Sequence, residues 1–238
     1  MSLKSFKTPL RYPGGKSRAL TKLFQFIPDL KKYKEYREPF LGGGSVAIEI
    51  TKRYPHLDVW VNDLYEPLYN FWSELQHNGD KLSNLLTGIK QCYCNPDAAR
   101  CLFQSMKEEV NDKTKSNLER ASAFYIVNKC SFSGLTESSS FSEQASESNF
   151  SLNGIEKLKT YATMIQNWKI TNLSYERMLT DDKDNFIYLD PPYDIKDNLY
   201  GRKGSIHKKF DHDQFAEWCD DYTAPMLISY NSDQIVKN

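Results

Sequence analysis

Short apolar runs and amphipathic stretches alternate along the 238-residue chain and predict a mixed α/β fold. Residues 36–40 lead into a glycine-rich turn at 41–45, and the pattern of residues 46–50 is helical, which indicates a strand, a turn and a helix in that order. A second short strand is predicted at residues 58–63. These segments together form a βαβ unit.

The pattern changes to amphipathic helices between about residues 66 and 165, and no strong strand interrupts them. Within this part, residues 131–151 are rich in serine and glutamate and are expected to form an exposed loop or a loose hairpin; low complexity and disorder explain this composition equally well. Helices are expected at residues 68–77, 79–90, 96–110 and 118–128.

Strand-like runs return at residues 168–171, 186–189 and 226–229. We therefore expect an α/β catalytic core, residues 1–65 and 166–238, that is split by a mainly helical insert over residues 66–165. The chain is long enough to bury a substantial core in this arrangement.

Composition narrows the class of protein. Lys plus Arg equals Asp plus Glu at 31 each, so any surface for nucleic acid must come from local clustering of charge. The five cysteines are odd in number and show no paired CxxC spacing, so neither a disulfide framework nor a metal site is predicted. A signal peptide and an apolar run of about 18 residues are both lacking, which favours a cytoplasmic protein with reduced thiols.

The tetrapeptide Asp190-Pro191-Pro192-Tyr193 carries the most chemical information, because it directly follows the apolar run 186–189. Open α/β sheets bind ligands at the carboxyl ends of their strands, and two prolines keep the chain extended with its carbonyls free. A carboxylate and a carbonyl that grip the two hydrogens of an exocyclic amine favour a more pyramidal, more reactive nitrogen. The alternative is a proline-rich turn that only caps the strand.

The glycine turn gives a second signal. Gly42, Gly44 and Ala47 fit a loose GxGxxA pattern, and Asp63 follows about 20 residues later, where dinucleotide-binding folds carry a ribose-binding acid. This segment does not distinguish NAD from S-adenosylmethionine, and a tight turn without a ligand is the alternative.

Four motifs together resemble the D12 class of DNA adenine N6-methyltransferases, relatives of the Dam enzymes. They are residues 11–16 (RYPGGK), 38–46 (EPFLGGGSV), 62–64 (NDL) and the tetrapeptide at Asp190, in this order over nearly the whole chain. The resemblance implies a Rossmann-like, S-adenosylmethionine-dependent methyltransferase core with an inserted helical target-recognition domain. It also implies methyl transfer, without a metal, to the N6 amino group of an adenine flipped out of double-stranded DNA.

The resemblance further implies roles for individual residues. Asp63 would bind the ribose hydroxyls of the cofactor, Asp190 and the Pro191 carbonyl would grip N6, and Tyr193 would stack on the flipped base. The implied cofactor-binding residues are Tyr12, Lys16, Phe40, Gly42, Gly44, Asp63 and Asp190. The implied catalytic residues are Asp190, Pro191, Pro192 and Tyr193.

Two segments are candidates for contact with DNA. Residues 128–138 resemble the region near the family's recognition hairpin, but Lys129 replaces the usual arginine, so specificity for GATC is not inferred. Residues 194–210 combine basic and aromatic side chains with glycines, which is typical of a flap that grips the DNA backbone, although a solvated loop is the alternative. The candidate contacts are Lys129, Ser133, His207, Lys208 and Lys209.

Two other functions fit parts of the sequence. An NAD-dependent oxidoreductase is favoured only by the glycine turn and Asp63, and a catalytically silent DNA-binding relative would keep the fold. The expected partners are double-stranded DNA and, in a restriction-modification pair, a cognate endonuclease; the protein is expected to be a monomer or a weak dimer. Members of the resembling family continue past the position of Asn238 with further strands.

Overall fold

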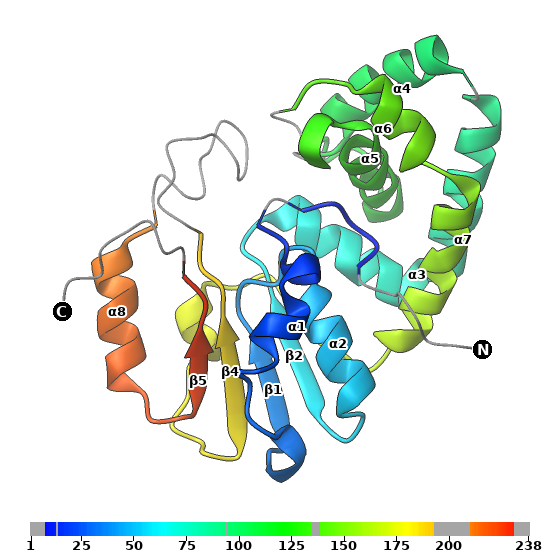
Figure 1. Ribbon diagram of the computed structural model, residues 1–238. Helices are drawn as coiled ribbons and strands as arrows, with labels where there is room; N and C mark the ends of the chain where they lie inside the picture. The colour runs from blue at the N-terminus through cyan, green and yellow to red at the C-terminus, as the bar shows by residue number, and fades with distance from the viewer. Residues whose placement is uncertain (1–7, 13, 94, 135–138, 193–209, 231–238) are drawn as a thin grey trace.

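The computed structural model describes residues 8–12, 14–93, 95–134, 139–192 and 210–230. In this part of the chain, five parallel strands form one sheet in the order β3-β2-β1-β4-β5 (Figure 1). The strands are β1 (Glu35–Glu38), β2 (Asp58–Asn62), β3 (Lys169–Thr171), β4 (Asn185–Leu189) and β5 (Met226–Ile228). The predicted α/β fold with a parallel sheet is confirmed, and each predicted strand ends within two residues of its expected bounds.

The strand order changes direction at β1, which pairs with β2 on one side and with β4 on the other. In the shared register, Tyr36 lies opposite both Val59 and Phe186. The helices that follow β1 and β4 in the described chain pack on opposite faces of the sheet, and in such sheets a crevice lies at this point of the strand order. Every residue of β4 is buried, as expected for a central parallel strand that is covered on both faces.

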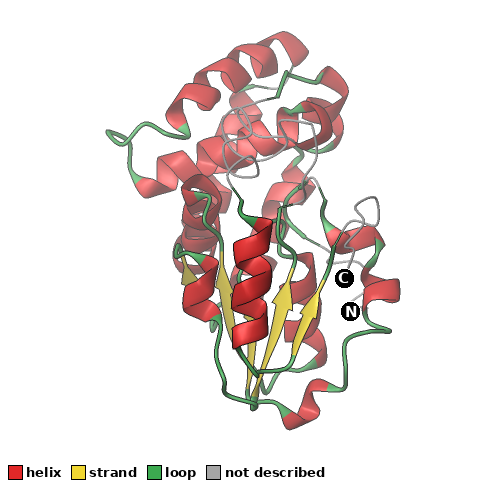
Figure 2. Cartoon of the chain, turned by 90° about the vertical axis from the view of Figure 1, so that its left-hand side faces the viewer, coloured by secondary structure: helices red, strands yellow, loops and turns green. Residues whose placement is uncertain are grey.

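Helices cover both faces of the sheet (Figures 1 and 2). Tyr188 of β4 belongs to the main core, together with buried residues of α2 (Ser45–Arg53) and partly buried ones of α1 (Leu20–Leu23). The neighbours Ile187 and Leu189 instead pack with Phe215 of α8 (His212–Asp221) in a smaller cluster. This alternation follows from the period of two along a strand, which sends successive side chains to opposite faces.

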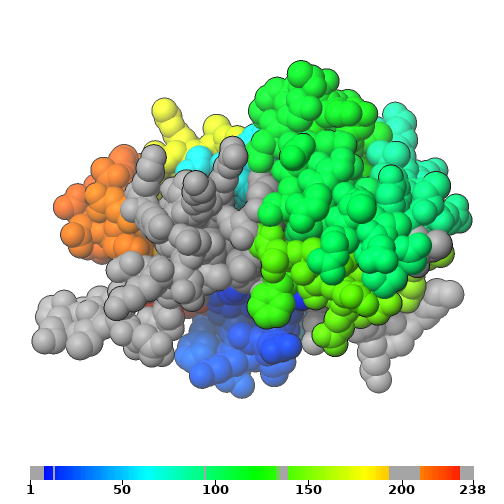
Figure 3. Space-filling model, turned by 90° about the horizontal axis from the view of Figure 1, so that it is seen from above, coloured from blue at the N-terminus to red at the C-terminus, as the bar shows by residue number. Residues whose placement is uncertain are grey.

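The described chain between β2 and β3 is mainly helical. In Figure 1, α4, α5 and α6 form a lobe above the carboxyl ends of the strands, and Figure 3 shows the same lobe from above. The helices are α3 (Glu66–Cys92), α4 (Pro96–Glu109), α5 (Asn117–Cys130), α6 (Glu143–Ser148) and α7 (Leu152–Met164). Short 3-10 helices are η1 (Lys16–Arg18), η2 (Leu30–Lys32), η3 (Phe132–Gly134) and η4 (Tyr175–Met178). A role of this lobe in target recognition stays a prediction.

The structure refines two of the expected local features. The helices predicted at 68–77 and 79–90 are the two arms of α3, and the predicted break between them is the kink at Asn78, which has non-helical angles, φ −130° and ψ 26°. The segment 131–151 was predicted to be an exposed loop or a loose hairpin. An antiparallel bridge between Ser131 and Phe141 agrees with a loose hairpin, but the described part also contains η3 and α6. Ser142 and Ser151 accept hydrogen bonds from backbone amides at the starts of α6 and α7, so these serines are helix caps.

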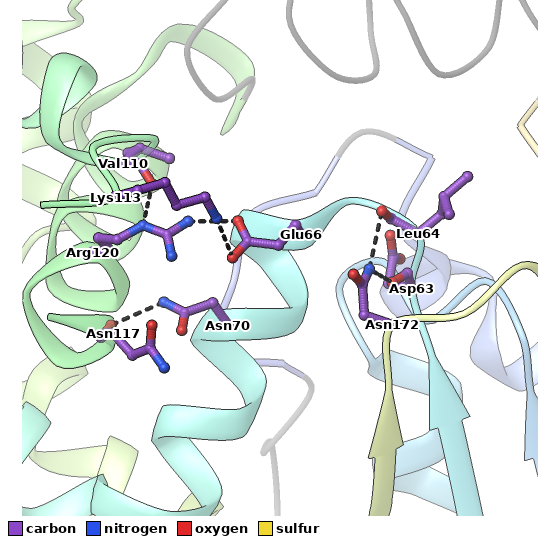
Figure 4. A network of polar contacts seen from close by, with 9 residues as sticks. All are labelled: Asp63, Leu64, Glu66, Asn70, Val110, Lys113, Asn117, Arg120 and Asn172. Atoms are coloured by element: carbon purple, nitrogen blue, oxygen red, sulfur yellow. Dashed lines mark hydrogen bonds and ion pairs between the residues drawn. The ribbon is translucent and has the colours of Figure 1, made fainter. Parts of the chain in front are cut away.

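A polar network fixes α5 to the first turn of α3 (Figure 4). The carboxylate of Glu66 accepts from Arg120, which is only 3% exposed, and lies 2.8 Å from the Lys113 Nζ. The Nε of Arg120 also donates to the carbonyl of Val110 at 3.1 Å. Because Glu66 follows the end of β2 closely, this network ties the helical lobe to the edge of the sheet where β2 ends.

Two glycines of α3 differ in how closely other atoms approach them. A Cβ at Gly79 would lie 2.4 Å from the Cβ of Ala162, whereas a Cβ at Gly88 would meet nothing within 4 Å. We expect Gly79→Ala to lower the free energy of unfolding by about 1–3 kcal/mol through overpacking. Gly88→Ala should raise it by about 0.4–1 kcal/mol, because alanine restricts the unfolded chain. Urea unfolding checks both values, and Ala162→Gly should relieve the Gly79→Ala defect; equal effects at the two glycines would contradict this packing.

Candidate active site

A pocket of about 380 Å³ opens at the carboxyl ends of β1, β2 and β4. It brings together nine of the residues that the sequence predicts for cofactor binding and catalysis. These are Tyr12, Lys16, Phe40, Gly42, Gly44, Asp63, Asp190, Pro191 and Pro192. The predicted residues Tyr193, His207, Lys208 and Lys209 lie outside the described residues.

The glycine turn after β1 forms one wall of the pocket. Gly42 and Gly44 have positive φ angles of 50° and 69°, which side chains with a Cβ rarely adopt. A Cβ at Gly44 would lie 2.7 Å from the ring of Trp72, whose indole N–H donates to the Gly42 carbonyl at 3.1 Å. The turn is therefore wedged against α3, and its glycines are required by backbone angle and by space.

Asp63 follows β2 and connects the glycine turn to the start of α3. Its two carboxylate oxygens accept from the backbone amides of Gly42, at 2.9 Å, and Tyr65, at 3.0 Å. Burial raises the pKa of Asp63 to about 6, and the two amide donors act in the opposite direction. Above that pH the pocket therefore presents a carboxylate whose orientation is fixed by the backbone.

Two asparagines that the sequence analysis did not single out hold the ends of the strands together. Asn62 is 1% exposed, and its amide donates to the carbonyls of Pro39, at 3.1 Å, and Leu173, at 2.9 Å. Asn172 donates to the carbonyl of Asp63 at 2.7 Å. In the sequence, the sign of this role was that each asparagine lies beside the end of a strand, where its side chain readily forms hydrogen bonds with nearby backbone groups.

Lys16 and Asp190 form an ion pair at the edge of the pocket. The Lys16 Nζ lies 2.7 and 2.6 Å from the two carboxylate oxygens of Asp190 and 3.1 Å from the carbonyl of Gly14. Both side chains are largely buried, at 15% and 19% exposed. Lys16 therefore orients the carboxylate that the sequence predicts to be catalytic.

Glu38, at the end of β1, is a pocket residue to which the sequence analysis gave no role. It is 2% exposed, and the hydroxyl of Tyr36 donates to its carboxylate at 2.6 Å. Burial raises the pKa of Glu38 to about 8; the charge of Asp190 raises it further, and the Tyr36 hydrogen bond lowers it. Because side chains alternate along β1, Glu38 shares the buried face with Tyr36, and this period of two was the signal for the residue.

Aromatic rings form the opposite wall of the pocket. The ring of Phe40 lies 5.4 Å from that of Tyr175 and 5.7 Å from that of Phe210, measured between centroids. Burial raises the pKa of Tyr175 to about 12, so its hydroxyl stays protonated at neutral pH. Such a wall suits a flat aromatic ligand. Tyr175 and Phe210 come from η4 and from the residues before α8, and no local motif marks them.

The comparison with known families now decides the class of this protein. The family model described as D12 class N6 adenine-specific DNA methyltransferase matches residues 12–238. The chain belongs to this family.

Three curated relatives show how much of the chain is shared. The Type II methyltransferase M.MjaIII of Methanocaldococcus jannaschii is 26% identical over 208 residues, which is 81% of this chain and 70% of that protein. The Type II methyltransferase M1.LlaDCHI of Lactococcus lactis subsp. cremoris is 27% identical over 195 residues, 77% of this chain and 64% of that protein. The DNA N-6-adenine-methyltransferase of Escherichia phage P1 is 29% identical over 126 residues, 53% of this chain and 15% of that protein.

Two classes of feature are lacking in the part of this methyltransferase that the structure describes. None of the described helices combines the length and apolar character needed to cross a membrane. The described residues also hold no group of three or more His, Cys, Asp or Glu side chains arranged to bind a metal ion.

The predicted DNA contacts on α5 and η3 lie outside the pocket lining. Lys129 is partly buried, with its Nζ 5.2 Å from the centroid of the Tyr125 ring. Burial lowers the pKa of Lys129 to about 8, and the charge of Arg11 lowers it further. Ser133 lies in η3. Contact of either residue with DNA stays a prediction.

Asn128 joins the end of α5 to the RYPGGK motif. Its buried side-chain amide accepts from the backbone N–H of Arg11 at 2.9 Å and donates to the Arg11 carbonyl at 2.5 Å. The guanidinium of Arg11 donates to the carbonyl of Ser131 at 2.8 Å. The segment that carries Tyr12 and Lys16 is therefore attached directly to the helical lobe.

We expect Asn128→Ala to loosen this motif, because both backbone groups of Arg11 lose their partner. Tryptic cleavage after Arg11 and Lys16 should accelerate, with a loss of stability of about 1–3 kcal/mol from unpaired polar groups. The matched control is Asn70→Ala. It also removes a hydrogen bond that a buried asparagine donates to a carbonyl, here the carbonyl of Asn117 at 2.9 Å. Equal acceleration in both variants would show that Asn128 stabilises the fold without holding this segment.

Proposed function

We propose that this protein transfers a methyl group from S-adenosylmethionine to the N6 amino group of an adenine in DNA. Membership of the D12 family gives the reaction class. The observation that carries the proposal is that Asp190, Asp63 and the glycine turn line one pocket at the crevice of the sheet. An amine-gripping carboxylate beside a candidate ribose-binding carboxylate is what such a transfer requires.

The donor set of the pocket fits this cofactor. The Asp63 carboxylate can accept hydrogen bonds from the ribose hydroxyls, and the rings of Phe40 and Tyr175, which contact each other, can line one side of an adenine. S-adenosylmethionine supplies an electrophilic methyl group on a positively charged sulfur. Among the described lining residues, five carboxyl groups and one basic side chain, Lys16, favour such a cation. The carboxyl groups belong to Glu38, Asp63, Glu176, Asp190 and Asp211.

Asp190 and Pro191 are proposed to activate the target amine. The carboxylate and the Pro191 carbonyl can each accept one N6 hydrogen, while Pro191 and Pro192 offer no backbone N–H that would compete for these acceptors. Lys16 holds Asp190 in place, and each carboxylate oxygen keeps lone pairs for the amine. The proton of the methylated amine is lost readily, so no strong dedicated base is required.

The target adenine must leave the duplex to reach this pocket. The lobe of α4, α5 and α6 stands above the carboxyl ends of the strands, where the pocket opens, which supports approach of double-stranded DNA from that side (Figure 1). We propose that Lys129, Ser133, His207, Lys208 and Lys209 contact this DNA and that Tyr193 stacks on the flipped base. Because two relatives are named type II methyltransferases, a cognate endonuclease is a further proposed partner.

The reaction is tested with methyl-labelled S-adenosylmethionine and plasmid DNA from a host without adenine methylation. After digestion to nucleosides, mass spectrometry should find the label in N6-methyladenine. Label in N4-methylcytosine would keep the methyltransferase class and overturn the target. Absence of label in DNA, with cofactor bound, would favour a catalytically silent relative.

We expect Asp190→Ala to reduce methyl transfer by at least about 10²-fold while cofactor affinity changes by only a few-fold. The carboxylate acts on the amine in the transition state. Its loss therefore lowers the rate of methyl transfer more than it lowers the affinity for the cofactor. Asp184→Ala, at a half-exposed position just before β4 where the carboxylate pairs with Lys34 outside the pocket lining, is the matched control and should keep parent rates. Turnover near the parent level in Asp190→Ala would remove Asp190 from catalysis.

Asp63→Ala should mainly weaken binding of S-adenosylmethionine, by about 1.5–3 kcal/mol, through loss of a charge-assisted contact with the ribose. In the parent protein, affinity should also fall as the pH drops below about 6, because Asp63 then becomes protonated. Calorimetric titration measures both effects, with Asp58→Ala, at the exposed start of β2, as the control. An unchanged dissociation constant would show that Asp63 only ties Gly42 to Tyr65.

A further inference from the structure

Glu38 is a buried acid in the pocket that the proposed methyl transfer does not use. It ends β1 and reaches the pocket lining while only 2% exposed. Its carboxylate accepts from the Tyr36 hydroxyl at 2.6 Å, and the amide of Ala47 in α2 also favours its ionised form. A carboxyl that is placed this deep beside a ligand pocket must either stay protonated or find a positive charge.

No basic side chain among the described residues forms an ion pair with Glu38, since Lys16 pairs with Asp190 instead. From β4, Asp190 presents a second negative charge, and from η1, Lys16 offers only partial compensation. Asp63 lines the same pocket from the end of β2, and α2 contributes the backbone amide of Ala47. Tyr188 of β4 is buried near Tyr36. Among the residues that the structure describes, Glu38 therefore has no cation of its own.

The pKa of Glu38 is raised to about 8, mainly by burial and next by the charge of Asp190. A carboxyl with a raised pKa is neutral at pH 7 and ionises when a cation approaches. The ligand proposed for this pocket carries a sulfonium charge, whereas its demethylated product, S-adenosylhomocysteine, has a neutral thioether.

We propose that Glu38 detects the sulfonium charge: its carboxyl is protonated in the free protein and gives its proton to solvent when S-adenosylmethionine binds. This inference rests on the proposed function, because it requires the cofactor to occupy this pocket. The carboxylate formed in this way then faces the sulfonium, and transfer of the methyl group removes the charge that kept Glu38 ionised. Proton uptake by Glu38 would accompany formation of the neutral product.

The test is calorimetric titration of the whole chain between pH 7 and 7.5, in buffers that differ in ionisation enthalpy. We expect S-adenosylmethionine to release close to one proton more from the parent protein than from Glu38→Gln, since most of a group with a pKa of about 8 is protonated there. For S-adenosylhomocysteine, the parent and the variant should release equal numbers of protons. Using the difference between the two proteins removes titration of the ligands themselves.

The affinity gives an independent readout. Below about pH 8, the dissociation constant of S-adenosylmethionine should rise by up to about tenfold for each pH unit lost, because the ionised form becomes scarcer. In Glu38→Gln the dissociation constant should no longer change between pH 6.5 and 8, while the loss of affinity below about pH 6, which is due to Asp63, should persist. If Glu38→Gln does not fold, Tyr36→Phe is the second variant. It removes the hydroxyl that donates to Glu38, so the pH dependence of the affinity should move to higher pH.

The outcomes separate this inference from the function on which it rests. Binding of S-adenosylmethionine without excess proton release, or equal excess release with both ligands, would overturn the role of Glu38 and leave the cofactor assignment intact. No binding of either ligand at any pH would overturn the cofactor assignment itself. An unshifted pH dependence in Tyr36→Phe would also contradict the role of Glu38.

Discussion

The ion pair between Lys16 and Asp190 is the contact on which the candidate site depends. It joins two residues 174 positions apart, one in the N-terminal RYPGGK motif and one at the end of β4. The parallel sheet makes this meeting possible, because it places the ends of β1 and β4 side by side at the point where the strand order reverses. The pair directs both carboxylate oxygens of Asp190 toward the Lys16 Nζ at the edge of the pocket.

The same motif also connects the site to the helical lobe. Asn128, at the end of α5, holds both backbone groups of Arg11, and Arg11 is followed directly by Tyr12 of the pocket wall. From the other side, Glu66 and Arg120 fix α5 to the start of α3, close to Asp63. A displacement of the lobe would therefore reach both the ion pair and the acid proposed to bind ribose. Under the proposed contact of the lobe with DNA, these bonds would be the physical route from DNA to the chemistry.

The sequence predicted those parts of the site that are written in local motifs. The strands and the glycine turn depend on nearby residues, and Asp63 and Asp190 directly follow strands, so periodicity and spacing were sufficient. Tyr175 joins the site only through the tertiary fold, and no motif marks it. Asn62 stands in the NDL motif and Phe210 in the segment assigned to DNA contact, but their places in the pocket lining appear only in the fold. In the segment 131–151, the bridge between Ser131 and Phe141 agrees with the predicted loose hairpin, whereas α6 was missed because serine composition does not distinguish a loop from a series of helix caps.

Glu38 shows a second kind of feature that the sequence alone does not predict. Its identity was visible within a motif, but the consequence of burial appears only when its neighbours are known. The pocket concentrates carboxyl groups around one basic side chain among its described residues, and Lys16 is already paired with Asp190. Under the proposal for Glu38, the ligand supplies the missing positive charge, which would link cofactor identity to the protonation of the protein.

Diffraction from crystals of the protein with bound S-adenosylmethionine tests the central claim most directly. The account predicts density for the cofactor in the pocket at the ends of β1, β2 and β4, with its ribose hydroxyls on the Asp63 carboxylate and its adenine beside Phe40 and Tyr175. Cofactor bound at another place, or in this pocket with its ribose away from Asp63, would contradict it.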